Sequence, residues 1–309
     1  MRFEDFTFKT RDGAEIAALK WLPEKSAKPK AAVQISHGMA EHSARYGRFA
    51  AALVEAGYAV YANDHRGHGK TAGDLENVGF FAAENGWSRV VEDMRQLTDI
   101  MKKEQPDTPV FLFGHSMGSI LSRSYIFSHG RDIKGVILSG TSGDPGLLGK
   151  IGMLITRWEI KRNGEKHRSP LLTKLSFGNF NNSFKPNRTD FDWLSRDEAE
   201  VDKYIADPYC GGMFTAGFFL DLLTGVNEAN DPGKLRSVPG DLPIFILSGE
   251  KDPVGKDAKG VMQVCRACRN AGVKDVTYKF YEGGRHEMLN ETNWEEVHSD
   301  VIKWLDDHC

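Results

Sequence analysis

The 309-residue sequence has no long hydrophobic run. A membrane-spanning helix needs roughly eighteen or more consecutive apolar residues, and the nearest approach, residues 146–155, is interrupted by Lys150. A secretory signal is missing as well, because Glu4, Asp5 and Lys9 stand where its apolar core would lie. These absences predict a cytoplasmic protein without a membrane-spanning segment.

Cysteine is scarce and charge is nearly balanced. Four cysteines make no disulfide framework. Cys265 and Cys268 have neither a second pair nor a histidine nearby to complete a zinc site, so we assign both to an ordinary helix. A net charge of −3 and an isoelectric point near 6.4 provide no basic surface for nucleic acid. The composition therefore predicts no bound metal and no nucleic-acid partner.

Short apolar runs alternate with longer amphipathic segments, a pattern typical of a mostly parallel sheet with helices on both faces. Asp12 and Gly13 between the first two runs indicate an antiparallel hairpin at the sheet edge. The predicted strands are 6–10, 15–21, 31–36, 58–64, 110–114, 135–140, 243–249 and 276–281, and the predicted helices are 45–56, 86–103, 117–129, 256–271 and 294–307.

Residues 143–240 differ from the two flanking blocks. They contain clusters of Lys and Arg, Asn-rich turns and apolar clumps, and this apolar content is too high for a disordered linker. We therefore predict a core formed by residues 1–142 and 241–309, with a helical insertion, the cap, at 143–240. The fold class is α/β.

A candidate nucleophile is Ser116, in the segment Gly114-His115-Ser116-Met117-Gly118. The segment follows a predicted strand and precedes a predicted helix, and a serine at such a sharp turn is held clear of the sheet. Glycines flank the turn because it leaves no room for side chains. An ordinary glycine-rich strand end is the alternative.

A serine hydroxyl needs a base and an orienting acid. His286 follows the last predicted strand and precedes the last predicted helix, whereas His298 and His308 fall within that helix or at its end. We therefore predict His286 as the base.

Asp252 is the predicted acid, because it follows strand 243–249 at the sheet edge where open α/β sheets bind ligands. Glu250, closer to the strand end, and Asp257, already in the predicted helix, are rivals. The order Ser116, Asp252, His286 is that of nucleophile, acid and base in α/β-hydrolases.

Two backbone N–H groups are predicted to hold the oxyanion. One belongs to Met117, directly after the nucleophile, and the other to Met39, after His37-Gly38 at the end of an early strand. A plain turn is the alternative for the His37-Gly38 pair.

Several segments together resemble the monoacylglycerol lipase and lysophospholipase branch of the α/β-hydrolase superfamily, which includes serine aminopeptidase-like hydrolases. The resemblance implies that the catalytic residues and oxyanion donors are those named above, with none of the family's catalytic residues replaced. It also implies a mobile cap at 143–240 that forms an acyl channel. The segments are HGMAEHSARY (37–46), NDHRGHGKT (63–71), GHSMGS (114–119), SGEKD (248–252) and RHEMLNE (285–291).

Within the cap, Phe214, Phe218 and Leu222 recur near helical spacing. They would line a tunnel for the acyl chain, although packing inside the cap is the commoner use of such a stripe. A basic cluster at 161–168 would allow at most a transient contact with a membrane surface, and a solvated loop is the alternative.

Other polar residues near these motifs suggest supporting roles. His65 and His68 look like metal ligands, but no carboxylate spacing completes a set. Glu41, His42 and Arg45 stand beside the oxyanion loop, where we expect them to brace it through hydrogen bonds. No dinucleotide fingerprint is present, so no cofactor is predicted.

We therefore predict a cofactor-free serine hydrolase that cleaves carboxylic esters with an apolar acyl chain through an acyl-enzyme on Ser116. Its partner would be a small lipid or ester, such as a monoacylglycerol or lysophospholipid, and the sequence makes no prediction of oligomeric state. A thioesterase and a non-catalytic binding protein are alternatives, although the complete set of catalytic residues argues against the latter. An aminopeptidase is another, with Asp197, Glu198, Glu200 or Asp202 as the group that holds the substrate ammonium.

Overall fold

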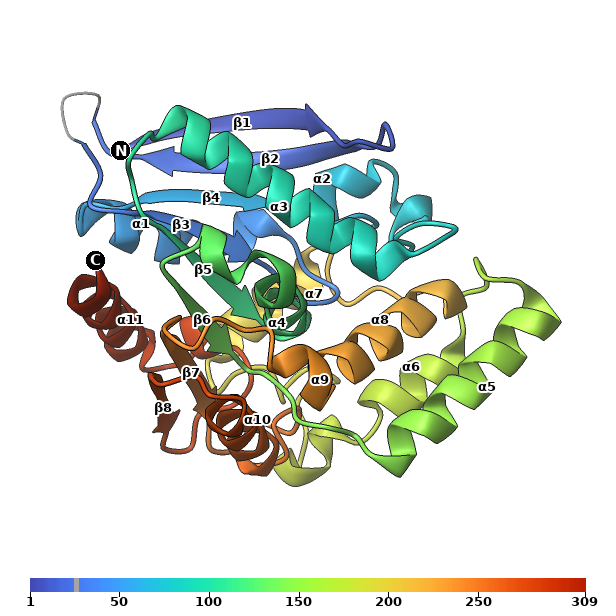
Figure 1. The fold of residues 1–309 in the computed structure, drawn as a ribbon. Helices are drawn as coiled ribbons and strands as arrows, with labels where there is room; N and C mark the ends of the chain where they lie inside the picture. The colour runs from blue at the N-terminus through green and yellow to red at the C-terminus, as the bar shows by residue number, and fades with distance from the viewer. Residues whose placement is uncertain (25–27) are drawn as a thin grey trace.

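One eight-stranded sheet organises the computed structural model, which describes residues 1–24 and 28–309 (Figure 1). The strand order is β1-β2-β4-β3-β5-β6-β7-β8. Strands β3 to β8 run parallel, and the β1–β2 hairpin joins them antiparallel through β4, as predicted. The strands are β1 (Arg2–Lys9), β2 (Glu15–Leu22), β3 (Ala32–Ser36), β4 (Ala59–Asn63), β5 (Val110–His115), β6 (Gly135–Ser139), β7 (Ile244–Gly249) and β8 (Val276–Tyr281).

Helices cover both faces of the sheet, which explains why its central strands are apolar throughout. In β5, Val110 and Leu112 face the cluster that includes α3, α4 and α10, while Phe111 and Phe113 face α1 and α11. The helices are α1 (Gly47–Glu55), α2 (Gly69–Ala72), α3 (Gly86–Glu104), α4 (Met117–His129), α5 (Leu147–Asn163), α6 (Pro170–Phe177), α7 (Glu198–Ala206), α8 (Ala216–Ala229), α9 (Pro232–Leu235), α10 (Lys259–Asn270) and α11 (Trp294–His308).

Two elements begin three or more residues away from the predicted position. β1 begins at Arg2 rather than residue 6, because an edge strand is held by backbone pairing and its exposed face carries no apolar pattern. α10 begins at Lys259 rather than residue 256, because Lys256, Asp257 and Ala258 adopt left-handed conformations. Asp257 is therefore not helical, contrary to the prediction.

Helices α5 to α9 lie between β6 and β7 in the sequence, within the predicted cap. α8 packs against α3 and α4 of the core and against α5, so α5 lies on the outer side of α8 (Figure 1). The buried Arg123 of α4 joins the start of this segment to the end of α8, since its guanidinium donates to Ser142 O at 2.8 Å and to Ala229 O at 2.6 Å. Among the described residues, no helix is both long and apolar enough to cross a bilayer.

Candidate active site

Ser116 lies at the sharp turn between β5 and α4, as predicted. Its backbone has φ +51° and ψ −118°, a strained conformation for a residue with a side chain. The flanking glycines permit close approach: a Cβ at Gly118 would lie 2.0 Å from Ser36 O, and one at Gly114 would lie 2.4 Å from Gly118 O. The turn therefore depends on glycine at both positions.

Asp252 and His286 form a buried pair. His286 Nδ1 lies 3.0 Å from each carboxylate oxygen of Asp252, and Oδ1 also accepts from Val254 N–H at 2.9 Å. Burial opposes a charged imidazole, but the Asp252 carboxylate outweighs it and raises the pKa of His286. Of the three acids considered, it is Asp252 that contacts the histidine, whereas Asp257 faces a different cavity with Lys251.

Ser116 and His286 line one cavity of about 500 Å³, together with Met39 and Met117. This volume lies within the range of small-molecule sites. Side chains of the segment between β6 and β7 complete the wall, among them Phe177, Phe180, Trp193, Leu194, Leu222 and Val226. The cavity thus has a polar floor on the core and a largely apolar wall from the cap helices.

The backbone N–H groups of Met39 and Met117 are available to a ligand. Within residues 1–24 and 28–309, neither group donates to a protein acceptor. Met117 opens α4, where N–H groups have no intrahelical partner. Gly38 brings the other loop against the nucleophile, since a Cβ there would lie 3.3 Å from Ser116 Cβ. Two donors therefore flank Ser116.

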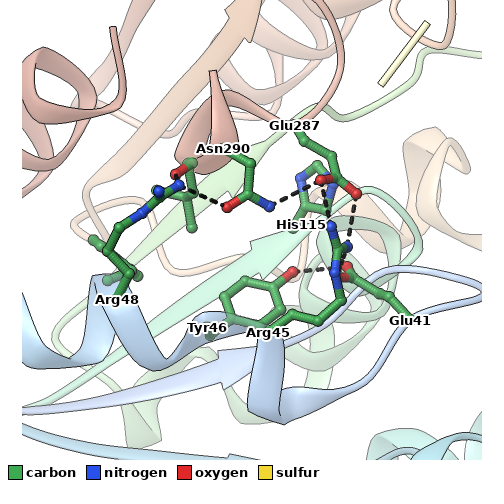
Figure 2. A pocket seen from close by; sticks show the side chains of 9 residues that line it. Glu41, Arg45, Tyr46, Arg48, His115, Glu287 and Asn290 are labelled. Carbon is green, nitrogen blue, oxygen red and sulfur yellow. Dashed lines mark hydrogen bonds and ion pairs between the residues drawn. The ribbon is translucent and has the colours of Figure 1, made fainter. Parts of the chain in front are cut away.

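A buried network of Glu41, Arg45 and Glu287 connects the loop of Met39 to the loop of His286 (Figure 2). Glu41 Oε1 accepts from Gly38 N–H at 2.6 Å, its Oε2 accepts from Arg45 at 2.8 Å, and Arg45 donates two bonds of 2.7 Å to Glu287. Although burial opposes ionisation, Arg45 lowers the pKa of Glu287. The bracing role predicted for Glu41 and Arg45 is confirmed.

Glu287 is a residue that the sequence did not single out. It directly follows His286, and its partner Arg45 is 242 positions away. The signal in the sequence was an acidic residue beside the predicted base, but its role becomes visible only when the two loops meet.

The predicted apolar stripe divides into two parts. Leu222 lines the 500 Å³ cavity. Phe214 and Phe218 have no exposed surface and pack against each other and against His68, and Phe218 also packs against Phe81, with ring centroids 4.5 to 5.8 Å apart. The two phenylalanines thus join α8 to the core, which is the packing role that the sequence had left open.

His65 and His68 also have packing roles. His65 Nε2 lies 3.0 Å from Ser36 Oγ, and its backbone N–H donates to His37 Nε2 at 2.9 Å. Burial lowers the pKa of all three histidines, because the charged imidazole is poorly solvated there. The His37 ring, after β3, packs against the other two rings in the loop that follows β4.

Comparisons with known proteins identify the family of this chain. Residues 27–293 match the family model described as serine aminopeptidase, S33. The monoglyceride lipase of Mus musculus is 31% identical over 282 residues, or 91% of this chain and 82% of its own. The monoacylglycerol lipase of Mycolicibacterium smegmatis is 29% identical over 307 residues, or 98% and 97%. A solved thermostable carboxyl esterase from Bacillus coagulans, in complex with glycerol, has a TM-score of 0.92 at 30% identity, covering 100% and 99%.

Proposed function

Because the chain belongs to the serine aminopeptidase S33 family and has the α/β-hydrolase fold, we propose that it hydrolyses monoacylglycerols and related esters with a single apolar acyl chain. The resemblance to monoacylglycerol lipases is confirmed, because relatives with the names monoglyceride lipase and monoacylglycerol lipase match this chain over most of their length. The chain is thus a hydrolase that acts on carboxylic esters. The observation that carries the substrate proposal is the 500 Å³ cavity, which joins Ser116 to a largely apolar wall.

In the proposed reaction, Ser116 Oγ attacks the ester carbonyl while His286 takes its proton. Asp252 holds the imidazole through Nδ1 and stabilises its charged form, a role supported by the two 3.0 Å contacts. The N–H groups of Met39 and Met117 hold the oxyanion, each contributing about 3 kcal/mol. The alcohol leaves, and water activated by His286 then releases the acid from the acyl-enzyme.

The aminopeptidase alternative is less favoured by the positions of the acidic cap residues. Asp197 caps α7, and Glu200 pairs with Arg48 and Lys203. Glu198 and Asp202 pair with Arg188. None of these four side chains belongs to the cavity wall around Ser116, so none is placed to bind a substrate ammonium.

We also propose that α5 and α6 make the transient lipid-surface contact. Their outer faces carry leucine, isoleucine and tryptophan side chains that are 43% to 73% exposed, namely Leu147, Leu148, Ile151, Leu154, Trp158, Leu171 and Leu175. Exposed apolar clusters of this kind mark interaction surfaces. Lys161 and Arg162 of the basic cluster end α5 nearby, whereas Arg168 bonds to backbone carbonyls and is part of the fold.

The proposed compartment is the cytoplasm. All four cysteines are free thiols, and two of them, Cys265 and Cys268, are buried in α10. A reducing compartment suits this state.

A long-chain fluorophosphonate tests the proposed function, since it reacts with an activated serine. We expect an adduct on Ser116 by peptide mass spectrometry, its loss in His286→Ala, and faster hydrolysis of monoacylglycerols than of amino-acid arylamides. An adduct on another serine would contradict the assignment of Ser116 as the nucleophile, and preferred arylamide hydrolysis would favour the aminopeptidase.

Vesicle flotation tests the proposed lipid contact. We expect Leu148→Asp to associate with vesicles more weakly than the unmodified protein, and equal association would contradict the contact.

A further inference from the structure

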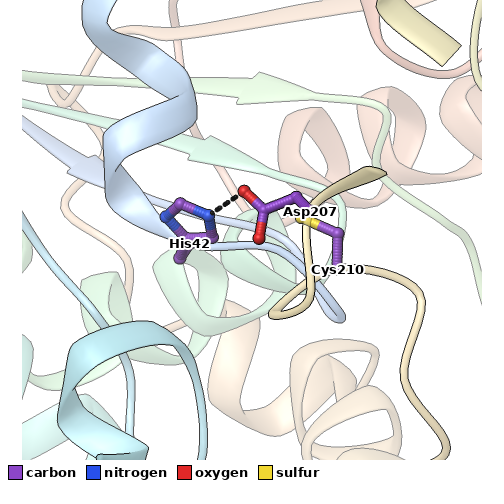
Figure 3. A group of neighbouring side chains, drawn as sticks. All are labelled: His42, Asp207 and Cys210. Carbon is purple, nitrogen blue, oxygen red and sulfur yellow. Dashed lines mark hydrogen bonds and ion pairs between the residues drawn. The ribbon is translucent and has the colours of Figure 1, made fainter. Parts of the chain in front are cut away.

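Three side chains with metal-binding atoms meet where the core contacts the cap (Figure 3). His42 follows the loop that carries Met39, whereas Asp207 and Cys210 follow α7. His42 Nε2 lies 2.8 Å from Asp207 Oδ2, and one donor atom of each residue lies within 4.8 Å of the other two. In the described part of the chain, no other group of three or more such residues is this close.

We propose that His42, Asp207 and Cys210 bind a thiophilic divalent cation of the Zn²⁺ type, with a fourth position open to solvent. Zn²⁺ takes nitrogen, oxygen and sulfur ligands at about 2.0 to 2.3 Å, which places tetrahedral ligand atoms about 3.5 Å apart. The three donor atoms are already within 4.8 Å of one another. The widest separation would have to shorten by about 1.3 Å to reach the tetrahedral spacing.

The charges around the trio favour a cation. Asp207 brings a carboxylate to the trio, with its Oδ2 2.8 Å from His42 Nε2. Arg45 is matched by both Glu41 and Glu287. The two lysines that line the adjoining cavity, Lys70 and Lys203, pair with Asp5 and Glu200, so each of these cations has a carboxylate partner other than Asp207.

His42 and Asp207 are accessible and are already held in contact without the cation. A surface cavity of about 510 Å³ is lined by His42, Asp207 and Tyr209, which gives an entry path and room for a water ligand. Tyr209 N–H donates to Asp207 Oδ1 at 2.9 Å and thereby leaves Oδ2 facing His42. Such outer contacts orient metal ligands.

A cation at this position would cross-link the cap to the oxyanion loop. Gly211, next to Cys210, donates its N–H to Ala40 O at 3.1 Å, and Gly211 also lines the cavity around Ser116. The cation therefore restrains the segments that border the cavity. It slows ester turnover, a consequence that rests on the proposed function.

Titration of the metal-free full-length protein with Co²⁺ tests the site. We expect a thiolate-to-cobalt band in the near ultraviolet and visible bands of tetrahedral cobalt, both removed by Zn²⁺. Cys210→Ser should abolish the near-ultraviolet band. His42→Gln should weaken Co²⁺ binding by more than about tenfold. Loss of a residue that only orients a ligand costs about tenfold at the least, and loss of a ligand itself should cost more.

Cys309→Ser is the matched control. Cys309 is an exposed thiol that follows another histidine–carboxylate pair, His308 and Asp275, at 3.1 Å. We expect it to keep the spectrum. A spectrum without a thiolate band, or one lost in Cys309→Ser and kept in Cys210→Ser, would overturn the site.

Two further measurements separate the site from the proposed function. Ser116→Ala should bind Co²⁺ like the unmodified protein, since binding does not need the nucleophile. Zn²⁺ should slow ester turnover severalfold in the unmodified protein and in Cys309→Ser, and much less in Cys210→Ser. Equal slowing in all three would overturn the link to the cap even if the cobalt spectrum were as expected.

Discussion

Helices α4 and α5 show how differently the core and the cap are built. In α4, all residues from Met117 to Ile126 are buried, whereas α5 buries only Gly149, Thr156 and Glu159. Close packing around α4 fixes the turn that carries Ser116. The outer face of α5 is left without a protein contact, so its apolar residues can meet an external surface. The core thus fixes the position of Ser116, while the cap lines the cavity and leaves an exposed apolar face.

The largest difference should appear between two serines that line the same cavity, Ser116 of the core and Ser176 of the cap. Ser116→Ala removes the proposed nucleophile, and we expect ester turnover to fall at least about 10⁴-fold with the fold intact. Ser176→Ala should change turnover only a few-fold. Initial rates and circular dichroism check both, and substantial turnover in Ser116→Ala would remove it from the reaction.

The next comparison divides the cap itself. Phe218 is fully buried between α8 and the core, whereas Leu154 of α5 is 66% exposed. Phe218→Ala should lower the free energy of unfolding by about 3 to 5 kcal/mol because it leaves a cavity, and Leu154→Ala should change it by less than about 0.5 kcal/mol. Urea unfolding measures both. Equal losses would mean that the outer face of α5 packs in solution.

The contribution of ion pairs to stability should also differ between the buried loops and the exposed surface of the cap. Arg45 and Glu287 are buried, so Glu287→Gln should cost about 3 kcal/mol. Because Arg45 lowers the pKa of Glu287, this stabilisation is present at neutral pH and is lost as pH falls through the lowered pKa. The exposed cap pair Arg188 and Asp202 is the control, and Asp202→Asn should cause no measurable loss. The free energy of unfolding at pH 7 and pH 3 would test this, since the difference between the two values should be smaller in Glu287→Gln than in the unmodified protein.

The smallest expected effect is a shift in the pH profile. Asp252 raises the pKa of His286 despite burial, and turnover needs the neutral imidazole. We therefore expect kcat/KM to fall as pH drops through a midpoint above about 6.5, the ordinary value for histidine. Asp252→Asn should lower that midpoint, while His167→Gln in the cap should leave it unchanged. The same midpoint in all three proteins would contradict the role of Asp252.

The sequence predicted the core well because its signals are local. Gly114, Ser116 and Gly118 prescribe the turn, and the buried strands are apolar on both faces. The cap was harder, since helical spacing alone does not reveal that Phe218 faces the core while Leu222 faces the cavity. The contact between Arg45 and Glu287 could not be predicted either, because it depends on two loops that meet only in the folded chain.

Arg123 has a consequence for protein engineering. A single guanidinium on the helix after Ser116 donates to Ser142 O, directly before the cap, and to Ala229 O, at the end of α8. The chain that enters the cap and the last turn of α8 are thereby held at one point of the core. A segment grafted between residues 142 and 229 would keep this anchor, so α5 to α8 could be exchanged without rebuilding the core.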